Sequence, residues 1–134
     1  MTKPLPQPNA VTRRFWSSCK DGRFEFQRCT ACGHAQFPPR LACAACHATA
    51  LDWQASAGRG EVYSFTVVHR APLDSFKADV PYMIAIVALE EGVRAMMNLR
   101  DADPATVTIG MPVEVFFEPT DGGDYPLPQA RPRK

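Results

Sequence analysis

Four cysteines form two Cys-x-x-Cys pairs, Cys29 with Cys32 and Cys43 with Cys46. Each pair can present two thiolates on one side of a tight turn, the arrangement known as a zinc knuckle. Two facing knuckles make a tetrahedral cage of four sulfur ligands, which suits zinc and leaves no open position for a substrate. The ten residues between the pairs are enough for a small hairpin that brings the knuckles together. The spacing therefore predicts a structural metal site.

Other uses of these cysteines compete with zinc. Four sulfur ligands can also hold iron, as in rubredoxin. The sequence Cys-Ala-Ala-Cys-His at 43–47 matches the c-type haem attachment pattern, but haem leaves the first pair without a role, and residues 1–9 contain no apolar export segment. A disulfide framework is disfavoured without such a segment and leaves Cys19 unpaired; buried thiols without any metal are the last alternative. Zinc is the predicted metal, iron stays open, and His34 and His47 are predicted surface residues.

Motifs of self-sufficient catalysis are absent from the sequence. It has no Gly-x-Ser-x-Gly elbow, no His-Glu-x-x-His and no phosphate loop. Glu90 and Glu91 form a carboxylate pair on a predicted hairpin tip, which favours a solvated turn over acid–base catalysis. His69 ends a predicted strand, but no base or nucleophile accompanies it in the sequence. We therefore identify no catalytic residue and expect no activity of the chain alone.

Length and composition place the chain among small globular proteins. Its 134 residues make one domain or two very small ones, and 46% of them are hydrophobic. A core of this size gains from a metal cross-link. No stretch approaches the roughly 18 apolar residues that a membrane-spanning helix requires, and we expect a cytoplasmic protein that does not enter membranes.

Charge is distributed unevenly along the chain. The net charge is +1, but residues 1–40 carry seven basic and two acidic side chains, whereas the remaining residues carry eight basic and twelve acidic ones. A basic front indicates either an anionic partner near the N-terminal half or two solvated faces that attract one another. A chain this close to neutrality is a poor candidate for binding nucleic acid through its phosphates.

The first half of the chain contains an arm, a helix and the metal module. Residues 1–8 include three prolines and show no periodicity. Asn9 can cap a helix that runs to about Lys20, with Phe15, Trp16 and Cys19 on one face. This aromatic face either packs internally or forms a docking surface. Alternating Phe24 and Phe26 predict a short strand that leads into the first knuckle.

The second half has the periodicity of β-strands. The predicted strands are 61–69, 81–89, 93–99 and 113–117, with a hairpin turn at 90–92 and a connection of possible helical character at 101–108. Tyr63, Phe65 and Val67 are predicted to share one face of the first strand. The nearly continuous apolar run at 81–89 predicts a strand covered on both faces. With 51–53 as a further contributor, about five strands suffice for a small closed barrel, followed by a Gly- and Pro-rich tail.

Together these motifs resemble the DUF35 family over roughly residues 11–120. The matching motifs are Phe15-Trp16, Cys29-x-x-Cys32-Gly33, Phe37-Pro38-Pro39-Arg40, Cys43-x-x-Cys46, Gly58-x-Gly60-x-Val62-Tyr63-Ser64, Pro81-Tyr82, Gly92-Val93 and Gly110-Met111-Pro112-Val113. The resemblance implies a mainly β protein in which a rubredoxin-like zinc ribbon precedes a five-stranded OB-fold barrel. The corresponding segments are an N-terminal arm and helix (1–22), the ribbon (23–52), the OB-fold (53–120) and an extended tail (121–134).

The same resemblance implies an accessory role. Family members accompany thiolase-like or lipid-transfer-type enzymes, or are fused to hydratase domains, in acyl-CoA, sterol or polyketide-like metabolism. We expect a non-catalytic subunit whose ribbon and aromatic helix dock on a thiolase-like or hydratase-like partner while the barrel holds acyl-CoA. Arg23, Arg28 and Arg40 in the basic front are the candidates for contacts with the CoA phosphates.

Two other functions stay open at this point. A nucleic-acid-binding module is possible because zinc ribbons and OB-folds both occur in such proteins. The barrel segment is acidic, however, and no face interleaves aromatic residues with Lys or Arg. A standalone enzyme such as a small hydratase or redox protein is the third hypothesis, and a complete set of four sulfur ligands disfavours catalysis at the metal.

Overall fold

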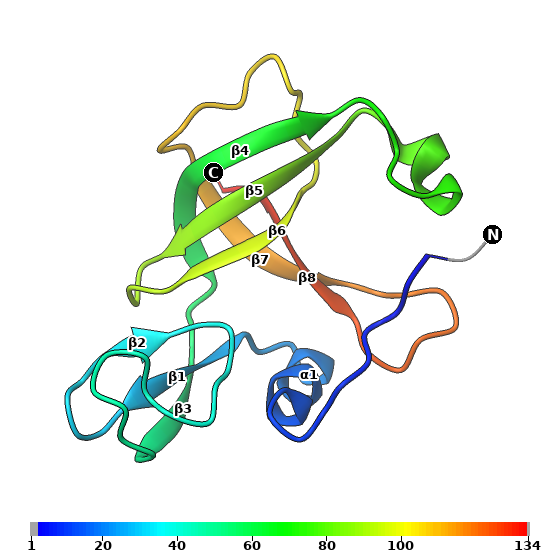
Figure 1. Ribbon diagram of the computed structural model, residues 1–134. Coiled ribbons are helices and arrows are strands. Elements are labelled where there is room, and N and C mark those ends of the chain that lie inside the picture. The colour runs from blue at the N-terminus through cyan, green and yellow to red at the C-terminus, as the bar shows by residue number, and fades with distance from the viewer. Residues whose placement is uncertain (1–2, 134) are drawn as a thin grey trace.

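The chain folds into a small ribbon module and a closed β-barrel that lie one beside the other (Figure 1). The computed structural model describes residues 3–133. No helix within these residues is long and apolar enough to cross a membrane. A three-stranded sheet and one helix make the ribbon module, and five strands make the barrel.

The regular elements follow one another in the order expected of a ribbon followed by a barrel. They are α1 (Arg13–Lys20), β1 (Glu25–Cys29), β2 (Ala35–Gln36), β3 (Leu51–Ala55), β4 (Arg59–Val68), the 3-10 helix η1 (Asp74–Asp79), β5 (Tyr82–Leu89), β6 (Arg94–Leu99), β7 (Pro112–Glu118) and β8 (Leu127–Pro132). The connection at 101–108 contains turns and no helix.

The predicted cap residue, Asn9, begins a turn at 10–12 that leads into α1, whose own N-cap position is Thr12. The Asn9 side-chain oxygen accepts hydrogen bonds from the backbone N–H groups of Val11 (2.9 Å) and Thr12 (3.0 Å), which satisfies donors that the first turn leaves free. Cys19 on the inner face is buried. Burial, followed by the charge of Glu25, raises the pKa of its thiol to about 12, so Cys19 is a neutral core residue.

An aromatic cluster holds α1 to the ribbon. The Phe15 ring lies 5.2 Å from that of Phe24 and 4.9 Å from that of Phe37, both edge to face, and Phe24 and Phe37 are stacked at 4.8 Å. Only 4% of Phe15 is exposed. The predicted docking role is therefore wrong for Phe15, because the apolar side of the helix packs inside the protein. Trp16 is half-buried and contacts Tyr125.

The ribbon sheet has the strand order β2–β1–β3. Residues 51–53, predicted to contribute to the barrel, instead belong to β3, which pairs antiparallel with β1 from Cys29↔Leu51 to Glu25↔Ala55. That part of the prediction is wrong because a five-residue alternating strand carries no local mark of the sheet it joins.

The barrel closes in the order β4–β5–β6–β8–β7, the topology of an OB-fold. Its last strand, β8, lies in the segment 121–134 that was predicted to be an extended tail. That prediction is wrong for 127–132, where β8 pairs antiparallel with β7 and meets β6 at the single parallel pair Leu99↔Ala130. Ala130 is fully buried. The prolines near both ends of β8 disguised it in the sequence, although prolines are tolerated at strand ends.

Strand β4 contains one β-bulge and one position at which the neighbouring strand β5 approaches unusually closely. A bulge between Val62 and Ser64 turns Tyr63 outward, so the predicted shared face of Tyr63, Phe65 and Val67 is wrong for Tyr63. At Gly60 the strand pairs with both β5 and β7. A Cβ atom there would lie 2.3 Å from the carbonyl oxygen of Ala88, so only glycine permits this close approach.

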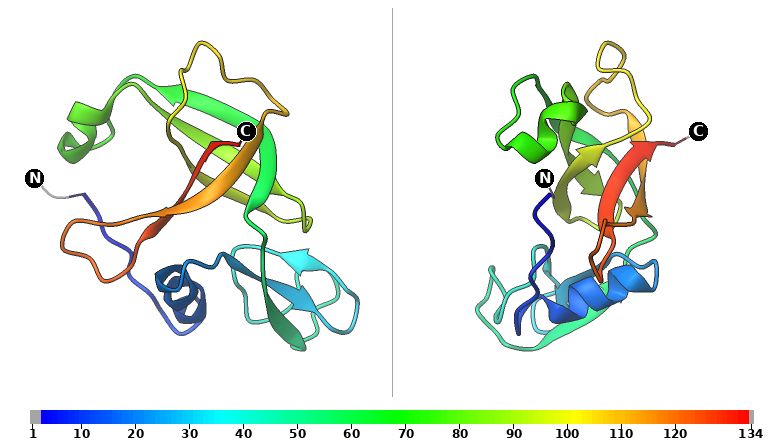
Figure 2. Two further views of the ribbon diagram at one scale, coloured as in Figure 1. Left: turned by 180° about the vertical axis from the view of Figure 1, so that it is seen from behind. Right: turned by 90° about the vertical axis from the view of Figure 1, so that its right-hand side faces the viewer.

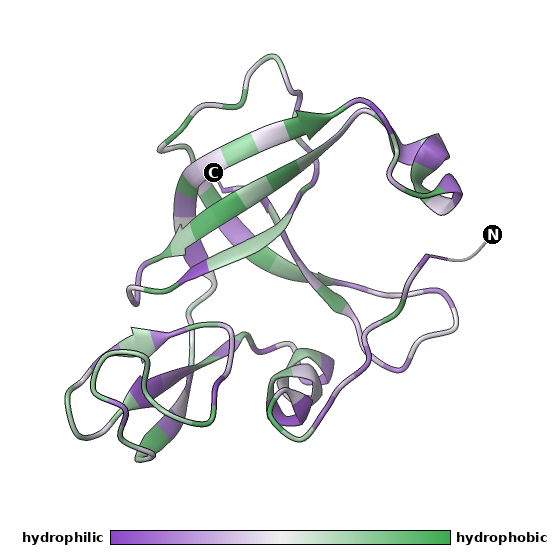
Figure 3. Cartoon of the chain, viewed as in Figure 1, coloured by the Kyte–Doolittle hydropathy of each residue, from purple (hydrophilic) through white to green (hydrophobic). Residues whose placement is uncertain are grey.

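Strand β5 is apolar along its length (Figures 1 and 3). Its inward residues are buried, whereas Ile84 and Ile86 on the outer face are half-buried. Helix η1 lies beside the start of β5 (Figure 2), where its Phe76 ring is 6.0 Å from the ring of Tyr82 on the outer face. The predicted coverage of both faces is therefore complete on the inner face and partial on the outer one.

The tip of the β5–β6 hairpin joins the barrel to the ribbon. The Glu91 carboxylate accepts hydrogen bonds from the Ser56 hydroxyl (2.6 Å) and the Ala57 N–H (2.8 Å) in the connection between β3 and β4. The Arg28 guanidinium on β1 donates to the Glu91 carbonyl at 3.5 Å. Glu91 therefore holds the junction together. The prediction of a solvated carboxylate is wrong for Glu91 and correct for the exposed Glu90.

Replacing Gly60 by alanine tests the close approach of β4 and β5. The added Cβ must push the two strands apart, so we expect Gly60→Ala to lower the free energy of unfolding by about 2–3 kcal/mol, measured by denaturant titration. Glu61→Ala on the exposed neighbour is the matched control and should change it by less than about 0.5 kcal/mol. Equal stability of the two variants would contradict the crowding.

Replacing Glu91 by glutamine tests the junction through its pH dependence. Partial burial raises the pKa of the Glu91 carboxyl, but the hydrogen bonds from Ser56 and Ala57 lower it by more, to a net value below the ordinary 4.5. The stability it confers is complete above the unfolded-state pKa and is lost as pH falls through the folded-state pKa. Glu91→Gln should therefore cost about 1–2 kcal/mol at pH 7 and nothing in acid well below pH 4.5. Glu90→Gln is the control; a pH-independent difference for Glu91→Gln would refute this role.

Candidate functional site

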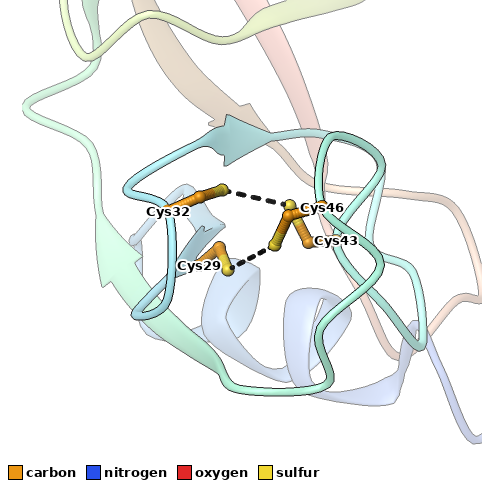
Figure 4. A group of neighbouring side chains, drawn as sticks. All are labelled: Cys29, Cys32, Cys43 and Cys46. Atoms are coloured by element: carbon orange, nitrogen blue, oxygen red, sulfur yellow. Dashed lines mark hydrogen bonds between the residues drawn. The ribbon is translucent and has the colours of Figure 1, made fainter.

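The four predicted cysteines come together in the ribbon (Figure 4). Their sulfur atoms all lie within 4.8 Å of one another, with 3.6 Å between Cys29 and Cys46 and between Cys32 and Cys43. A tetrahedral zinc site with Zn–S bonds of ~2.3 Å places its sulfurs roughly 3.8 Å apart. The set therefore has the size and composition of a metal site built from four cysteines. Residues of both pairs contribute to it, which contradicts haem attachment at one pair.

The two knuckles have the same backbone geometry. The Gly33 N–H donates to the Cys29 carbonyl (2.8 Å), and the His47 N–H donates to the Cys43 carbonyl (2.9 Å). Both residues have a positive φ, 82° at Gly33 and 66° at His47. His47 thus occupies the left-handed position that glycine fills in the first knuckle, and its side chain, like that of His34, is exposed. The prediction of two surface histidines is confirmed.

The electrostatics of the thiols favour a bound cation. Backbone N–H groups of Cys46 and Ala45 directed at the Cys43 sulfur lower the pKa of that thiol to about 6. The N–H of His34 lowers the pKa of the Cys32 thiol, but the neighbouring sulfurs raise it by more, to about 12. Four thiolates this close repel one another unless a positive ion lies between them. The donor set therefore fits a divalent metal held by sulfur alone.

Two buried glutamines position the second knuckle, and the sequence analysis missed both. The Gln36 side-chain oxygen accepts from the Ala44 N–H (2.9 Å), and its NH2 group donates to the side-chain oxygen of Gln27 (2.8 Å). Gln27 in turn binds the N–H and carbonyl of Arg40, both at 2.9 Å. These bonds attach the loop that carries Cys43 to β1 and β2. Alternation along β1 was the signal that could have found Gln27 as an inward polar residue.

The three candidate arginines do not converge on one site. Arg28 donates to the Gln54 side chain (2.9 Å), the Gly33 carbonyl (3.0 Å) and the Glu91 carbonyl. Arg23 pairs with Asp21 at 3.4 Å. The Arg40 backbone is itself bound by Gln27, whose side chain points to the opposite face of β1 from Arg28. The guanidinium groups of Arg23 and Arg28 are therefore already engaged in contacts within the chain.

A cleft of about 540 Å3 opens at the end of the barrel where β5 begins and β7 ends. The arm preceding α1 forms one wall, with Lys3 paired to Asp79 and lying over the Phe76 ring. Apolar and polar side chains share the remaining walls. Its principal lining residues are Lys3, Leu5, Phe76, Tyr82, Arg100 and Leu127.

Arg100 is the distinctive polar feature of this cleft. Its NH2 group donates to the Glu118 carboxylate at 3.1 Å, and Glu118 also accepts from Gln129 at 3.2 Å. The Arg100 Nε atom is buried without a hydrogen-bond partner among the described residues. The cleft therefore combines apolar walls with a polar network of Arg100, Glu118 and Gln129. None of Arg23, Arg28 and Arg40 lines it, and His69 lies exposed at the end of β4.

Two family models match the chain, one for each module. Residues 16–52 match the rubredoxin-like zinc ribbon domain of ChsH2, and residues 53–118 match the C-terminal OB-fold domain of ChsH2. The order and limits of the matches agree with the ribbon and barrel of the structure.

Curated relatives fall into two groups. A DUF35 domain-containing scaffold protein of Methanocaldococcus jannaschii is 43% identical over 72% of this chain and 70% of its own length. A probable enoyl-CoA hydratase alpha subunit of Thermomonospora curvata is 35% identical over 97% of this chain, and the 3-oxo-4,17-pregnadiene-20-carboxyl-CoA hydratase alpha subunit of Mycobacterium tuberculosis is 42% identical over 84%. The chain spans only 40% and 35% of these two hydratase subunits.

Solved structures share the whole fold. A chain of an Ltp2-ChsH2(DUF35) aldolase superposes with a TM-score of 0.84 at 35% identity, covering 95% of this chain and 98% of that chain. A DUF35 protein of unknown function from Sulfolobus solfataricus superposes with a TM-score of 0.65 at 14% identity, covering 93% and 87%. The second likeness concerns the fold alone.

Removing the Gln36 side-chain bonds tests how the knuckle is held. Gln36→Leu keeps the approximate size but leaves the Ala44 N–H and the Gln27 side chain without a partner. We expect metal release to a chromogenic chelator about 10–100-fold faster than from the unmodified protein, because loss of the bonds loosens the loop that carries Cys43. The chelator assay measures the rate directly, and elemental analysis gives the metal identity.

Two variants calibrate this experiment. Gln54→Leu, on the exposed side of the same sheet, should release metal at the original rate. Cys29→Ser removes a ligand and should lower metal content and stability together, because structural metal binding is coupled to folding. Release from Gln36→Leu at the rate of Gln54→Leu would show that the buried glutamines do not support the metal.

Proposed function

The chain belongs to the DUF35 family of ChsH2-like proteins, which join a rubredoxin-like zinc ribbon to an OB-fold, and we propose that it is a non-catalytic accessory subunit of an acyl-CoA-transforming enzyme. Its partner is a thiolase-like, hydratase-like or lipid-transfer-type protein. The observation that carries this proposal is the superposition of nearly the entire chain on nearly the entire matched chain of an Ltp2-ChsH2 aldolase.

The absence of catalytic machinery within residues 3–133 supports a subunit role. Four sulfur ligands would fill the coordination sphere of a metal and leave no position for a substrate. Of the paired carboxylates, Glu91 accepts a hydrogen bond from Ser56 at the junction and Glu90 forms an ion pair with Arg59. His69 has no hydrogen-bonded base or nucleophile among these residues. Such a chain contributes binding and positioning, and the reaction belongs to its partner.

Acyl-CoA binding is the finer part of the proposal. The cleft near Arg100 offers apolar wall residues for an acyl chain and donor-bearing side chains, among them Lys3, Asn98 and Gln129, for a carbonyl or carboxylate oxygen. For the CoA phosphates we keep Arg40 ahead of Arg23 and Arg28, because no side-chain hydrogen bond or ion pair engages its guanidinium among the described residues. Zinc is the metal we assign to the four cysteines, where it would supply structural cross-linking.

A nucleic-acid-binding function is less well supported. OB-folds bind single strands on the outer face of their second and third strands with stacked aromatic and basic side chains. In this chain the middle of that face, on β5 and β6, carries Ile84, Ile86 and Met96, with Arg94 and Asn98 on either side of Met96. The nearby ring of Tyr63 on β4 is covered by the Arg94 guanidinium at 3.9 Å. An aliphatic face of this kind suits contact with protein or lipid-like groups.

Co-purification from the cells of origin tests the proposal. The tagged chain at native expression should purify with a thiolase-like, hydratase-like or lipid-transfer-type enzyme in a fixed ratio through size exclusion, identified by mass spectrometry. Turnover of an acyl-CoA by the complex, and none by the chain alone, would support the accessory role. Capture of ribosomal or transcription components, or turnover by the chain alone, would overturn it.

Titration with acyl-CoA separates partner binding from ligand binding. Calorimetry of the chain and of the complex with an acyl-CoA, against free CoA, should give binding that weakens with added salt if phosphate contacts contribute. Arg40→Gln should reduce that salt dependence, and Arg23→Gln is the matched control because Arg23 is already paired with Asp21. Salt-insensitive binding would exclude the phosphate role of Arg40 but would leave the accessory role standing.

A further inference from the structure

Four of the six residues of strand β6 have a neighbouring strand on one side only. Residues 94–99 pair with 83–88 of β5, but β8 meets β6 only at Leu99↔Ala130, the pair through which the barrel closes. Among residues 3–133, no strand pairs with 94–97 on the side away from β5. We call this unpaired side of 94–97 the open seam.

The backbone groups that face this seam can be identified from two independent sets of hydrogen bonds. The Leu89 N–H donates to the Val93 carbonyl, so alternate pairing along β6 turns the N–H and carbonyl groups of Arg94, Met96 and Asn98 away from β5. On the β8 side, the Asn98 N–H does donate to the Gln129 side-chain oxygen (2.9 Å), and the Arg100 N–H donates to the Ala130 carbonyl (2.7 Å). The same groups of Arg94 and Met96 consequently point into the open seam.

Residues 94–97 contain no lysine, proline or bulge that would protect this edge. Proteins block free edges with lysine, proline, a bulge or a covering segment. Where the seam closes, the buried side chain of Gln129 satisfies the Asn98 N–H. Where it opens, the only charged side chain of 94–97, Arg94, lies across β5 on the Tyr63 ring. Met96 exposes 74% of its surface.

We propose that an extended segment of the partner enzyme adds to residues 94–97 of β6 as a further strand of the sheet. This inference rests on the proposed accessory function and names the surface that serves it. Two N–H and two carbonyl groups repeat at two-residue intervals, roughly 6.6 Å, which is the spacing of an extended peptide and of no small ligand. The alternate side chains of the added strand would pack beside Met96 on the outer face.

The same geometry favours a different protein over a second copy of this chain. Two copies paired through four residues of β6 would bury far less than the roughly 1,200–2,000 Å2 of a specific interface. A partner with a larger surface can continue from the edge onto the aliphatic outer face, where Ile86 stands directly beside Met96 and Ile84 follows along β5. Edge and face then form one interface with directional hydrogen bonds and apolar burial.

A proline at position 96 tests the edge hydrogen bonds. Met96→Pro removes one seam-facing N–H and obstructs strand addition, but it takes no hydrogen bond from the β5–β6 pairing, and proline is tolerated on such an edge. We expect its affinity for the co-purified enzyme to fall at least tenfold, whereas Met96→Thr, which keeps the N–H, should stay within about threefold. Unchanged metal content and melting temperature verify the fold of both variants.

Photo-crosslinking decides the matter if the proline variant does not fold. The photoreactive residue p-benzoylphenylalanine at position 96 should link to the partner enzyme in cells, and at the exposed position of Asp124, between β7 and β8, it should not. Binding of Met96→Pro equal to that of the unmodified chain would overturn strand addition while the accessory role stands. Links from position 96 to a second copy would replace it with self-pairing. An unmodified chain that captures no enzyme would overturn the proposed function and this inference together.

Discussion

If the four cysteines bind a metal as we propose, the attraction between four thiolates and one cation is the interaction on which the ribbon depends. Between β2 and β3 the chain runs through 37–50 without regular structure, and β2 itself is two residues long. Backbone pairing alone cannot order such a segment, because each fixed residue costs about 1–2 kcal/mol of conformational entropy. Mutual repulsion of the sulfurs would add to that cost. A metal ion reverses the sign of the electrostatic term, and the loop then has a fixed point at each knuckle.

Order created at the metal extends outward through polar contacts. Gln36 binds Gln27 and the loop next to Cys43, and both glutamines lie on the strands that carry or follow the first knuckle. Strand β1 then carries Arg28 to the carbonyl of Glu91 on the barrel. In addition, the Glu91 carboxylate of the barrel accepts hydrogen bonds from the connection between β3 and β4. Ribbon and barrel are consequently joined through groups whose positions depend on an ordered β1.

Features defined by neighbouring residues could be predicted from the sequence, and features defined by distant pairing could not. The cysteine spacing is local, and the four cysteines meet as the sequence predicted. The hydrogen bonds of Asn9 are also local, but they cap the turn that precedes α1 rather than α1 itself. Strand β8 was missed because its prolines indicate coil, although its pairing with β7 fixes it in the barrel. The basic front suggested an anionic ligand, but a count of charges cannot show that Arg23 pairs with Asp21. The buried side-chain atoms left without a partner among the described residues are instead the Nε atoms of Arg100 and Arg133, in a segment whose net charge is negative.

The aliphatic outer face of the barrel differs from the ribbon in that folding alone does not require it. The inward residues of β5 fill the barrel core, but Ile84, Ile86 and Met96 on the outer face add little to that core and leave apolar surface in water. Polar side chains at these positions would satisfy the same strand pairing and would lower the risk of aggregation at a free edge. An aliphatic face beside an unpaired strand is therefore explained by contact with another molecule rather than by the stability of this one. In the ribbon, by contrast, the metal site and the aromatic cluster stabilise the module itself.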